Sequence, residues 1–481
     1  MNGIFSRFLV CAQCRPSSYS SNQTPESKKY WKWIVTVAVL VALFAWSITP
    51  APFEYLDPEK KVVVFGTASH ILPLVRIVNF VFHPFRKALV PLEFETLKSE
   101  AIEQVGFHDF GSLINLDELE KFAQVADQIA HFSGRVGMKD TITNILAIHL
   151  TIAKTVHENP EILQEKIEKP IFLAACSRSG STFFYHVLAD TFDEEVVPIY
   201  SYEAFGGPVQ LAHKPPRKEF TDETYRVLDA VNPPLGIMHE FTNAEDPEEE
   251  TGWYMNTMRG IAAAFILPSY WLQLNVLQES SVEMNRNFWE TVLKIKQWKA
   301  GRKQRFILKA PEHLFGLPYL TEEFPDASFV TVHRNEESMY KSGLAVTHAY
   351  RHMFMEPTVS DSIAYQDFLV CNERKALEVS RDEKYDSKVM EVRFEDGLFT
   401  NTFEIIAKFA KHAGLPWDEA KQAHARSVIA KRLSWKKHKA KYRMKDFGFE
   451  DGGNTERLQT VCDNLPTTVE GLEEFYKLIP Q

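Results

Sequence analysis

The chain has 481 residues, a formal net charge of -10 at pH 7 and 45% hydrophobic residues. This length is enough for one large α/β domain with an additional segment, and the acidic balance excludes a general nucleic-acid binder. The cysteines are too few and too scattered for a disulfide framework. They are Cys11, Cys14, Cys176, Cys371 and Cys462.

Two segments with distinct compositions begin the chain. Residues 1–30 are rich in Ser, Asn, Gln and Pro, which predicts a disordered cytosolic tail. Residues 31–49 are apolar with tryptophans at both ends, and their length is near the lower limit for crossing a bilayer, so we predict a transmembrane anchor. Basic residues precede this run and acidic residues follow it. That bias predicts a single-pass type II membrane protein with a lumenal catalytic part, located in the Golgi.

Residues 50–91 are predicted to form a stem. Their apolar stretch is interrupted by basic residues, which fits an interfacial segment better than a second membrane span, although both interpretations are open. From residue 92 to residue 168, apolar residues recur every three and four positions. This spacing predicts a helical subdomain of two or three helices that packs on one face of an α/β core.

A buried strand followed by a tight loop is predicted around residues 171–182. The apolar run ends at Cys176 and continues as Ser177-Arg178-Ser179-Gly180-Ser181-Thr182, after which a helical pattern begins. The first amides of a helix have no partner within it, and the helix dipole favours an anion there. The spacing is similar to a nucleotide phosphate loop, but Ser181 replaces the lysine that reaches the β- and γ-phosphates. An ordinary strand–turn–helix with a solvated arginine is the alternative.

An acidic run follows a long proline- and glycine-rich region. His239-Glu240 is followed by six residues, 245–250, of which five are acidic. We interpret this run as the solvated acidic start of a helix, because acidic side chains favour a first helical turn. The alternative is that His239 or Glu240 serves as a base on the acceptor side.

Two further strands are predicted to end in basic residues. One apolar run ends at Lys309 and continues through a proline turn to His313, and a second run, 329–333, ends at Arg334. Strands alternating with helices predict a parallel sheet, whose ligands lie at the carboxyl ends of the strands. Arg178, Lys309, His313 and Arg334 should therefore lie along one edge of that sheet.

Together these residues resemble the sulfotransferase family that uses 3′-phosphoadenosine-5′-phosphosulfate (PAPS). The resemblance spans about residues 94–449 and is greatest to the branch with a Lys-Ser/Ala-Pro-x-His-Leu segment, here residues 309–314. It implies a three-layer α/β fold with a parallel sheet of P-loop-like topology over residues 169–481. The chain differs from the family pattern at residues 174–177, where a glycine or Tyr-Pro is usual, and at Asn335-Glu336, where Asp-Pro is common.

The resemblance also implies roles for these side chains. Arg178 and the segment Ser179, Gly180, Ser181 and Thr182 would hold the 5′-phosphosulfate, and Arg334 with Ser342 would hold the 3′-phosphate. Lys309 would stabilise the transferred group, and His313 would take the proton from an acceptor hydroxyl. Arg443, in a late basic segment, is a further candidate for the cofactor, with a solvated basic face as the alternative. No metal is implied.

The acceptor and two other functions are left open by the residues. The acceptor hydroxyl could belong to a carbohydrate, a lipid or a small alcohol. An ATP-dependent phosphotransferase is one alternative, to which Ser181 in place of lysine is the main objection. A non-catalytic lumenal scaffold with a degenerate nucleotide pocket is the other.

Overall fold

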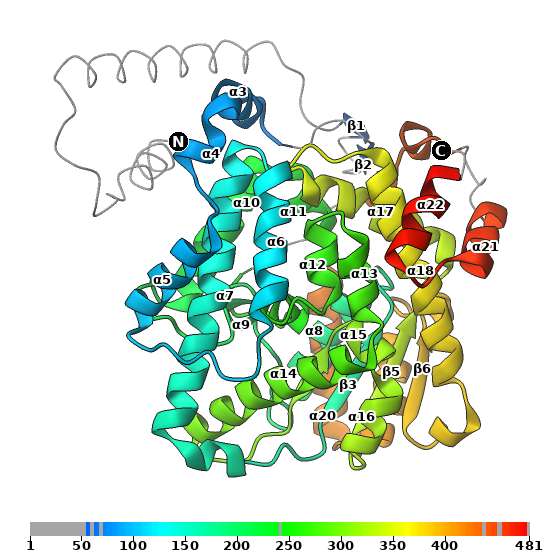
Figure 1. Cartoon of the computed structure of the whole chain (residues 1–481). Helices are drawn as coiled ribbons and strands as arrows, with labels where there is room; N and C mark the ends of the chain where they lie inside the picture. Colours follow the sequence, from blue (N-terminus) through cyan, green and yellow to red (C-terminus); the bar gives the residue numbers. More distant parts are fainter. Residues whose placement is uncertain are drawn as a thin grey trace. The chain divides into compact units, whose positions relative to one another are not determined.

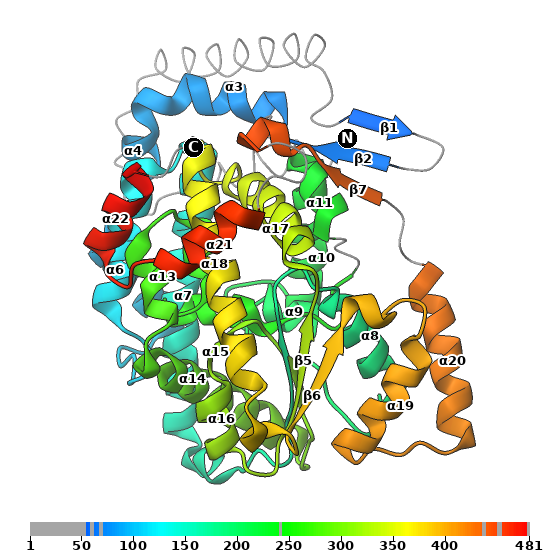
Figure 2. The ribbon, with the colours of Figure 1, turned by 90° about the vertical axis from the view of Figure 1, so that its right-hand side faces the viewer.

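The computed structural model describes residues 54–57, 62–66, 71–239, 243–434, 439–449 and 455–478. At its centre is a sheet of four strands in the order β4-β3-β5-β6, and every neighbouring pair is parallel (Figures 1 and 2). The strands are β3 (Ile171–Ala175), β4 (Ile307–Lys309), β5 (Ser328–His333) and β6 (Val389–Arg393). Because β3 is an inner strand, the loop that follows it lies between the ends of its two neighbours.

The side chains of β3 alternate between two apolar cores. Phe172 belongs to the larger core, whereas Ile171 and Leu173 belong to a second core on the other face of the sheet. All five residues of β3 are buried. A parallel sheet that is covered on both faces needs such continuous apolar strands, so the predicted α/β fold with a three-layer parallel sheet is confirmed.

Helices cover both faces of the sheet. On one face lie α8 (Ser181–Thr191), α19 (Thr402–Ala413) and α20 (Glu419–Ser434), whose apolar residues share a core with Leu173 (Figure 2). On the other face lie α14 (Glu279–Ala300), α15 (Glu312–Phe315), α16 (Leu317–Glu323) and α18 (Val359–Ser380). The loop between β3 and α8 thus lies at the carboxyl edge of the sheet, between the helical layers that cover its two faces.

The region from residue 92 to residue 168 contains three α-helices. They are α5 (Phe94–Val105), α6 (Leu116–Ile129) and α7 (Phe132–Glu158). Side chains of Glu93, Asn115 and His131 accept hydrogen bonds from backbone amides of the first turns, which explains where each helix begins. Apolar residues of these helices lie in the same core as Phe172 of β3, so the helices belong to the layer on that face of the sheet.

Eight further α-helices follow the loop in the described residues. They are α9 (Ser201–Ala204), α10 (Arg217–Val231), α11 (Pro233–His239), α12 (Ile261–Ile266), α13 (Tyr270–Val276), α17 (Glu336–Arg351), α21 (Thr455–Asn464) and α22 (Val469–Leu478). A disulfide between Cys371 and Cys462 joins α18 to α21, a pairing that the sequence did not predict. Cys176, at the end of β3, is buried and has a free thiol.

The predicted stem contains short strands and helices. β1 (Glu54–Asp57) pairs antiparallel with β2 (Val62–Phe65), and β2 pairs parallel with β7 (Lys439–Tyr442), so the stem and a C-terminal strand form one small sheet (Figure 2). Two helices follow, α3 (Pro73–Phe82) and α4 (Arg86–Leu89).

The membrane part of the fold prediction is corrected. The predicted tail, 1–30, and the predicted anchor, 31–49, lie outside the described residues. Within the ranges given above, every helix is too short or too polar to cross a membrane. The ten residues of α3 would span only about 15 Å of a hydrocarbon core of about 30 Å. The predicted single-pass membrane protein is corrected to this extent: the described residues contain no transmembrane helix, and β2, α3 and α4 take the place of a second span in the predicted stem.

Candidate active site

The loop between β3 and α8 has the backbone shape of an anion-binding turn. Arg178 and Gly180 both have left-handed backbones, with φ values of 62° and 87°. A Cβ atom on Gly180 would lie 3.0 Å from Phe394 and 3.1 Å from Leu398, so glycine is needed for both reasons. The hydroxyl of Ser179 donates to the carbonyl of Cys176 over 2.6 Å. The loop is therefore folded tightly onto the end of β3 and leads directly into the N-terminus of α8.

The side chain of Arg178 connects this loop to α17 and to α11. Its Nε donates to Ser342 Oγ over 2.9 Å, and its NH2 donates to the carbonyl of Met238 over 2.8 Å. Ser342 Oγ is also 3.0 Å from the hydroxyl of Tyr442 at the end of β7. The two residues that the resemblance assigned to different phosphates, Arg178 and Ser342, thus lie in direct contact.

Lys309 ends β4 and lies beside the first turn of α8. Its Nζ donates to Thr182 Oγ1 over 3.1 Å and also contacts the carboxylate of Glu249. The lysine is only 2% exposed. A buried ammonium can stabilise negative charge strongly, because few waters compete for it.

Arg334 follows β5 at the same sheet edge. Its guanidinium lies 4.1 Å from the centre of the Phe394 ring, and the side chain is half-buried. Helix α17 begins two residues later, after Asn335 caps its first turn by accepting from the Ser338 amide. Arg178, Lys309 and Arg334 therefore come from three adjacent strand ends, as the parallel sheet predicted.

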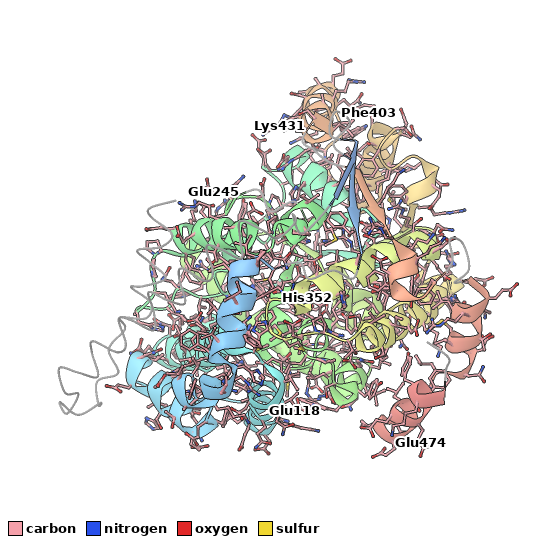
Figure 3. All side chains as sticks on the ribbon, turned by 90° about the horizontal axis from the view of Figure 1, so that it is seen from above. Glu118, Glu245, His352, Phe403, Lys431 and Glu474 are labelled. Atoms are coloured by element: carbon pink, nitrogen blue, oxygen red, sulfur yellow. A yellow bond between two sulfur atoms is a disulfide. The ribbon has the colours of Figure 1, made fainter. Side chains whose placement is uncertain are left out.

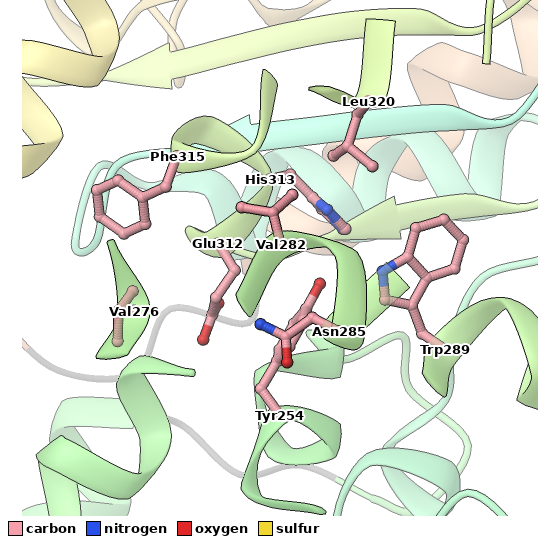
Figure 4. A pocket seen from close by; sticks show the side chains of 9 residues that line it. All are labelled: Tyr254, Val276, Val282, Asn285, Trp289, Glu312, His313, Phe315 and Leu320. Atoms are coloured by element: carbon pink, nitrogen blue, oxygen red, sulfur yellow. The ribbon is translucent and has the colours of Figure 1, made fainter. Parts of the chain in front are cut away.

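His313 is buried behind this edge. Its Nε2 contacts the carboxylate of Glu250, and the two side chains are 1% and 0% exposed. Its ring packs against Phe172, with ring centres 4.8 Å apart, and against the edges of Tyr254 and Trp289. The ring also lines a small cavity of about 10 Å³, with room for about one water molecule (Figure 4). In this structure His313 is therefore held in a polar pair inside the core.

The acidic run 245–250 is not a solvated helix start, which corrects our interpretation of it. Glu245 is exposed (Figure 3) and pairs with Lys218, but Glu248 and Glu250 are buried. Glu250 accepts the backbone N–H of Lys309 over 2.9 Å with one oxygen and contacts His313 with the other. The run places carboxylates next to the two predicted catalytic residues.

Glu248 has an unusual pKa for a buried acid. Burial alone would raise it, but a hydrogen bond and the charge of His239, together with Lys309, lower the pKa of Glu248 to about 2. The His239 ring at the end of α11 lies 3.4 Å from this carboxylate. His239 is thus a partner of Glu248 in the structure, whereas Glu240 lies outside the described residues.

Three residues near the site were missed from the sequence. Glu249 and Glu250 were assigned to a solvated run, and Tyr442 lies in a segment where Arg443 was the named candidate. Arg443 lies at the surface with its guanidinium 3.8 Å from Asp446, while Tyr442 contacts Ser342. No pattern in the sequence indicated that Glu249 and Glu250 lie beside Lys309, about sixty residues later in the chain, and none pointed to Tyr442.

A fourth missed residue, Glu373, holds the loop from α18. Its Oε1 accepts the backbone N–H of Ser177 over 2.6 Å, and its side chain is 1% exposed. Burial raises the pKa of Glu373 to about 8, although hydrogen bonds from Ser177 act in the opposite direction. In the described ranges, no group of three or more His, Cys, Asp or Glu side chains could hold a metal ion.

Comparison with known proteins identifies the class. Residues 170–419, which include β3, β4, β5, β6 and the loop after β3, match the sulfotransferase family. The chain belongs to this family and is a sulfotransferase. Members of the family transfer a sulfuryl group from a sulfate donor.

Two curated relatives and two solved structures are similar to the chain. The omega-hydroxy-beta-dihydromenaquinone-9 sulfotransferases Stf3 of Mycobacterium bovis and Mycobacterium tuberculosis are each 25% identical over 303 residues, 59% of this chain and 70% of theirs. Sulfotransferase STF9 from Mycobacterium avium has the same fold, with a TM-score of 0.61 at 18% identity over 78% of this chain and 96% of its own. STF1 from Mycobacterium tuberculosis gives 0.55 at 20% identity over 80% and 98%.

The expected Golgi location is corrected by the same comparison. The curated relatives are mycobacterial sulfotransferases, not Golgi membrane proteins. In the described ranges no helix could cross a membrane, and the type II Golgi assignment is not proposed again.

Proposed function

We propose that the chain transfers a sulfuryl group from PAPS to a hydroxyl group of an acceptor. The observation that carries this proposal is the convergence of Arg178, Lys309 and Arg334 on one sheet edge at the N-terminus of α8. PAPS carries a 5′-phosphosulfate and a 3′-phosphate on the same ribose, so it needs two anion sites close to each other, as Arg178 and Ser342 are. A helix N-terminus with a cation beside it suits one such group, and a second guanidinium suits the other.

The residues divide between the two anionic groups of the donor. The amides of residues 179–182 with Arg178 would bind the 5′-phosphosulfate at the start of α8. Arg334 and Ser342 would bind the 3′-phosphate, with Tyr442 orienting the Ser342 hydroxyl. The left-handed turn at Gly180 supports this assignment, because it leads the loop directly into the N-terminus of α8. PAPS itself supplies the activated sulfuryl group.

Lys309 would stabilise charge on the transferred group. Its Nζ is beside Thr182, in the first turn of α8, so it lies next to the proposed phosphosulfate site. The Glu249 carboxylate neutralises this ammonium in the ligand-free chain. Sulfuryl transfer, like phosphoryl transfer, depends on positioning and charge stabilisation more than on covalent help from the protein.

For the acceptor proton we propose His313, with Glu250 orienting its ring. A base that is held by a carboxylate is a common arrangement in proton transfer. Both side chains are buried, and the cavity beside Tyr254 and Glu312 has room for about one water molecule, so the surrounding side chains would have to move before an acceptor hydroxyl could reach His313. Glu249, which is 27% exposed and contacts Lys309, is the second candidate for the base.

We propose a hydrophobic alcohol as the first acceptor class to assay. The curated relatives are named for an omega-hydroxy menaquinone derivative, which is a lipid with a hydroxyl group. Carbohydrate hydroxyls and small alcohols form the comparison set. Parallel assays with one member of each class and labelled PAPS would show which hydroxyl accepts the label.

The donor is tested by thermal unfolding of the full chain with adenosine 3′,5′-bisphosphate or with ATP–Mg²⁺. A ligand that binds only the folded state stabilises it by about 2.7 kcal/mol at one hundred times its Kd, so the melting temperature rises by several degrees. We expect a rise with the bisphosphate and none with ATP–Mg²⁺. A rise with ATP–Mg²⁺ alone would favour a phosphotransferase, and no rise with either would favour a non-catalytic scaffold.

A further inference from the structure

We propose that Glu373 of α18 is a positioning residue, which holds the loop of residues 176–180 in its anion-binding shape. This role rests on the proposed function, because it concerns the loop assigned to the 5′-phosphosulfate. Glu373 lies almost two hundred residues after the loop and does not belong to any motif of the sequence. Its connection to the site is through Ser177, whose backbone amide donates to Glu373 Oε1 and whose side chain also interacts with the carboxyl.

The bond is short and lies inside the protein. Glu373 Oε1 accepts from Ser177 N over 2.6 Å, and the side chain is 1% exposed. Within the part of the chain that the structure describes, the second oxygen, Oε2, is buried without a hydrogen-bond partner. A carboxyl in this setting has one strong contact, and that contact is to the loop. Its burial is hard to explain by packing alone, since an apolar side chain would fill the space at lower cost.

The loop needs such support because part of it has an uncommon backbone conformation. Arg178, directly after Ser177, has a φ of 62°, which residues with a Cβ rarely adopt. Within the loop, the hydroxyl of Ser179 ties back to Cys176, whose amide donates to Val332 of β5 over 2.8 Å. The bond to Glu373 fixes Ser177, between the sheet and the left-handed residue. It therefore decides in which direction the Arg178 side chain and the following amides leave the sheet.

The charge of Glu373 matters because the loop is proposed to bind an anion. Glu373 contacts the residue that precedes Arg178, so an ionised carboxylate there would repel the anion. A neutral carboxyl can accept the hydrogen bond from the Ser177 amide without this repulsion. Burial raises the pKa of Glu373 to about 8, which favours the neutral form near pH 7. The titratable groups that interact electrostatically with it are the Cys176 thiol at the end of β3 and the Tyr365 hydroxyl on α18. A glutamine should therefore replace Glu373 with little loss.

The test is calorimetric titration of adenosine 3′,5′-bisphosphate into the full chain at pH 7. The variants are Glu373→Gln, which keeps an acceptor for the Ser177 amide, and Glu373→Met, which keeps the shape without an acceptor. Glu378→Gln, at an exposed position of the same helix, is the matched control. We expect the Gln variant to bind within about threefold of the wild type and the Met variant to bind at least tenfold more weakly. The stoichiometry should stay at one in every variant, which separates a lost contact from a misfolded fraction.

Hydrogen exchange of the same ligand-free variants tests the role without the donor. The segment 171–184 should exchange faster in Glu373→Met than in Glu373→Gln, while the rest of the sheet exchanges equally in both. Equal exchange in this segment, or equal bisphosphate affinity of the two variants, would overturn the positioning role. If the wild type binds no bisphosphate but the exchange difference is present, the proposed donor fails and the structural link between Glu373 and the loop stands.

Discussion

Two sets of buried glutamates lie near the site, and their carboxyl groups behave in opposite ways. Glu248 lies next to His239 and near Lys309, and these groups lower its pKa to about 2 despite burial. Glu312 and Glu373 accept hydrogen bonds from backbone amides, of Ile261 and Ser177 respectively, and burial raises the pKa of each to about 8. The side chain is the same in all three cases; the presence of a nearby cation decides the result.

The difference shows that glutamates near the sheet edge have two distinct roles. The segment 248–250 supplies carboxylates that balance the positive charge of Lys309 and hold His313. Glu312 and Glu373 act as neutral hydrogen-bond acceptors that fix backbone amides. Ionised carboxylates without a neighbouring cation would repel an anionic ligand. The carboxylates of segment 248–250 are compatible with an anion site because Lys309 and His239 lie beside them.

Removing Glu250 should cause the largest loss of stability. Glu250→Ala leaves the His313 ring nitrogen and the Lys309 amide without their acceptor inside the core, and breaking such a buried pair costs about 3 kcal/mol. Urea unfolding of the full chain at pH 7 measures the free energy of unfolding. Glu245→Ala is the matched control, because its surface pair with Lys218 contributes less than about 1 kcal/mol. Equal losses in the two variants would mean that the acidic run is a uniform surface feature.

The raised pKa of Glu312 should make the free energy of unfolding depend on pH, and this effect is the next to test. The pKa of Glu312 is about 8 in the folded chain and 4.5 in the unfolded one, so the folded chain binds more protons between these values. Its contribution to stability is lost as pH rises from about 4.5 to about 8. Relative to the wild type, Glu312→Gln should therefore gain stability over this window, by on the order of 5 kcal/mol, because each pKa unit corresponds to about 1.4 kcal/mol.

Glu248→Gln is the contrasting variant in the same measurement. The folded-state pKa of Glu248 is about 2, so its contribution is fully present above pH 4.5 and is lost as pH falls towards 2. The variant should be less stable than the wild type at pH 6, and the two should converge on acidification. If both variants deviated from the wild type with the same sign, the distinction between the two sets would be refuted.

The parts of the fold that depend on residues close together in the sequence were predictable. The apolar run 171–175, the glycine at 180 and the basic residues at the strand ends predicted a parallel sheet with a polar carboxyl edge, and the structure places Arg178, Lys309 and Arg334 there. Strand and turn patterns depend on neighbouring residues, so a single sequence reveals them. The assignment of these residues to particular phosphates is a prediction that the titrations described here would test.

The contacts made over long separations were not predictable. Glu373 reaches Ser177 from 196 residues away, and the Cys371–Cys462 disulfide spans 91 residues. Nothing in the local pattern of α18 distinguishes a glutamate that faces a loop from one that faces water. The acidic run 245–250 was misinterpreted for the same reason, since its burial depends on Lys309 and His313. The membrane anchor was predicted from an apolar run, its flanking tryptophans and the charges around it, and these residues lie outside the described ranges.

The most direct test of the proposed donor site is calorimetric titration of adenosine 3′,5′-bisphosphate into the wild type, Arg334→Ala and the exposed control Arg302→Ala. If the sheet edge holds the 3′-phosphate, Arg334→Ala should bind about 100-fold more weakly, since a charge-assisted hydrogen bond contributes about 1.5–3 kcal/mol. Arg302→Ala should bind like the wild type. Equal binding by all three chains would contradict the assignment of Arg334 and, with it, the proposed donor site.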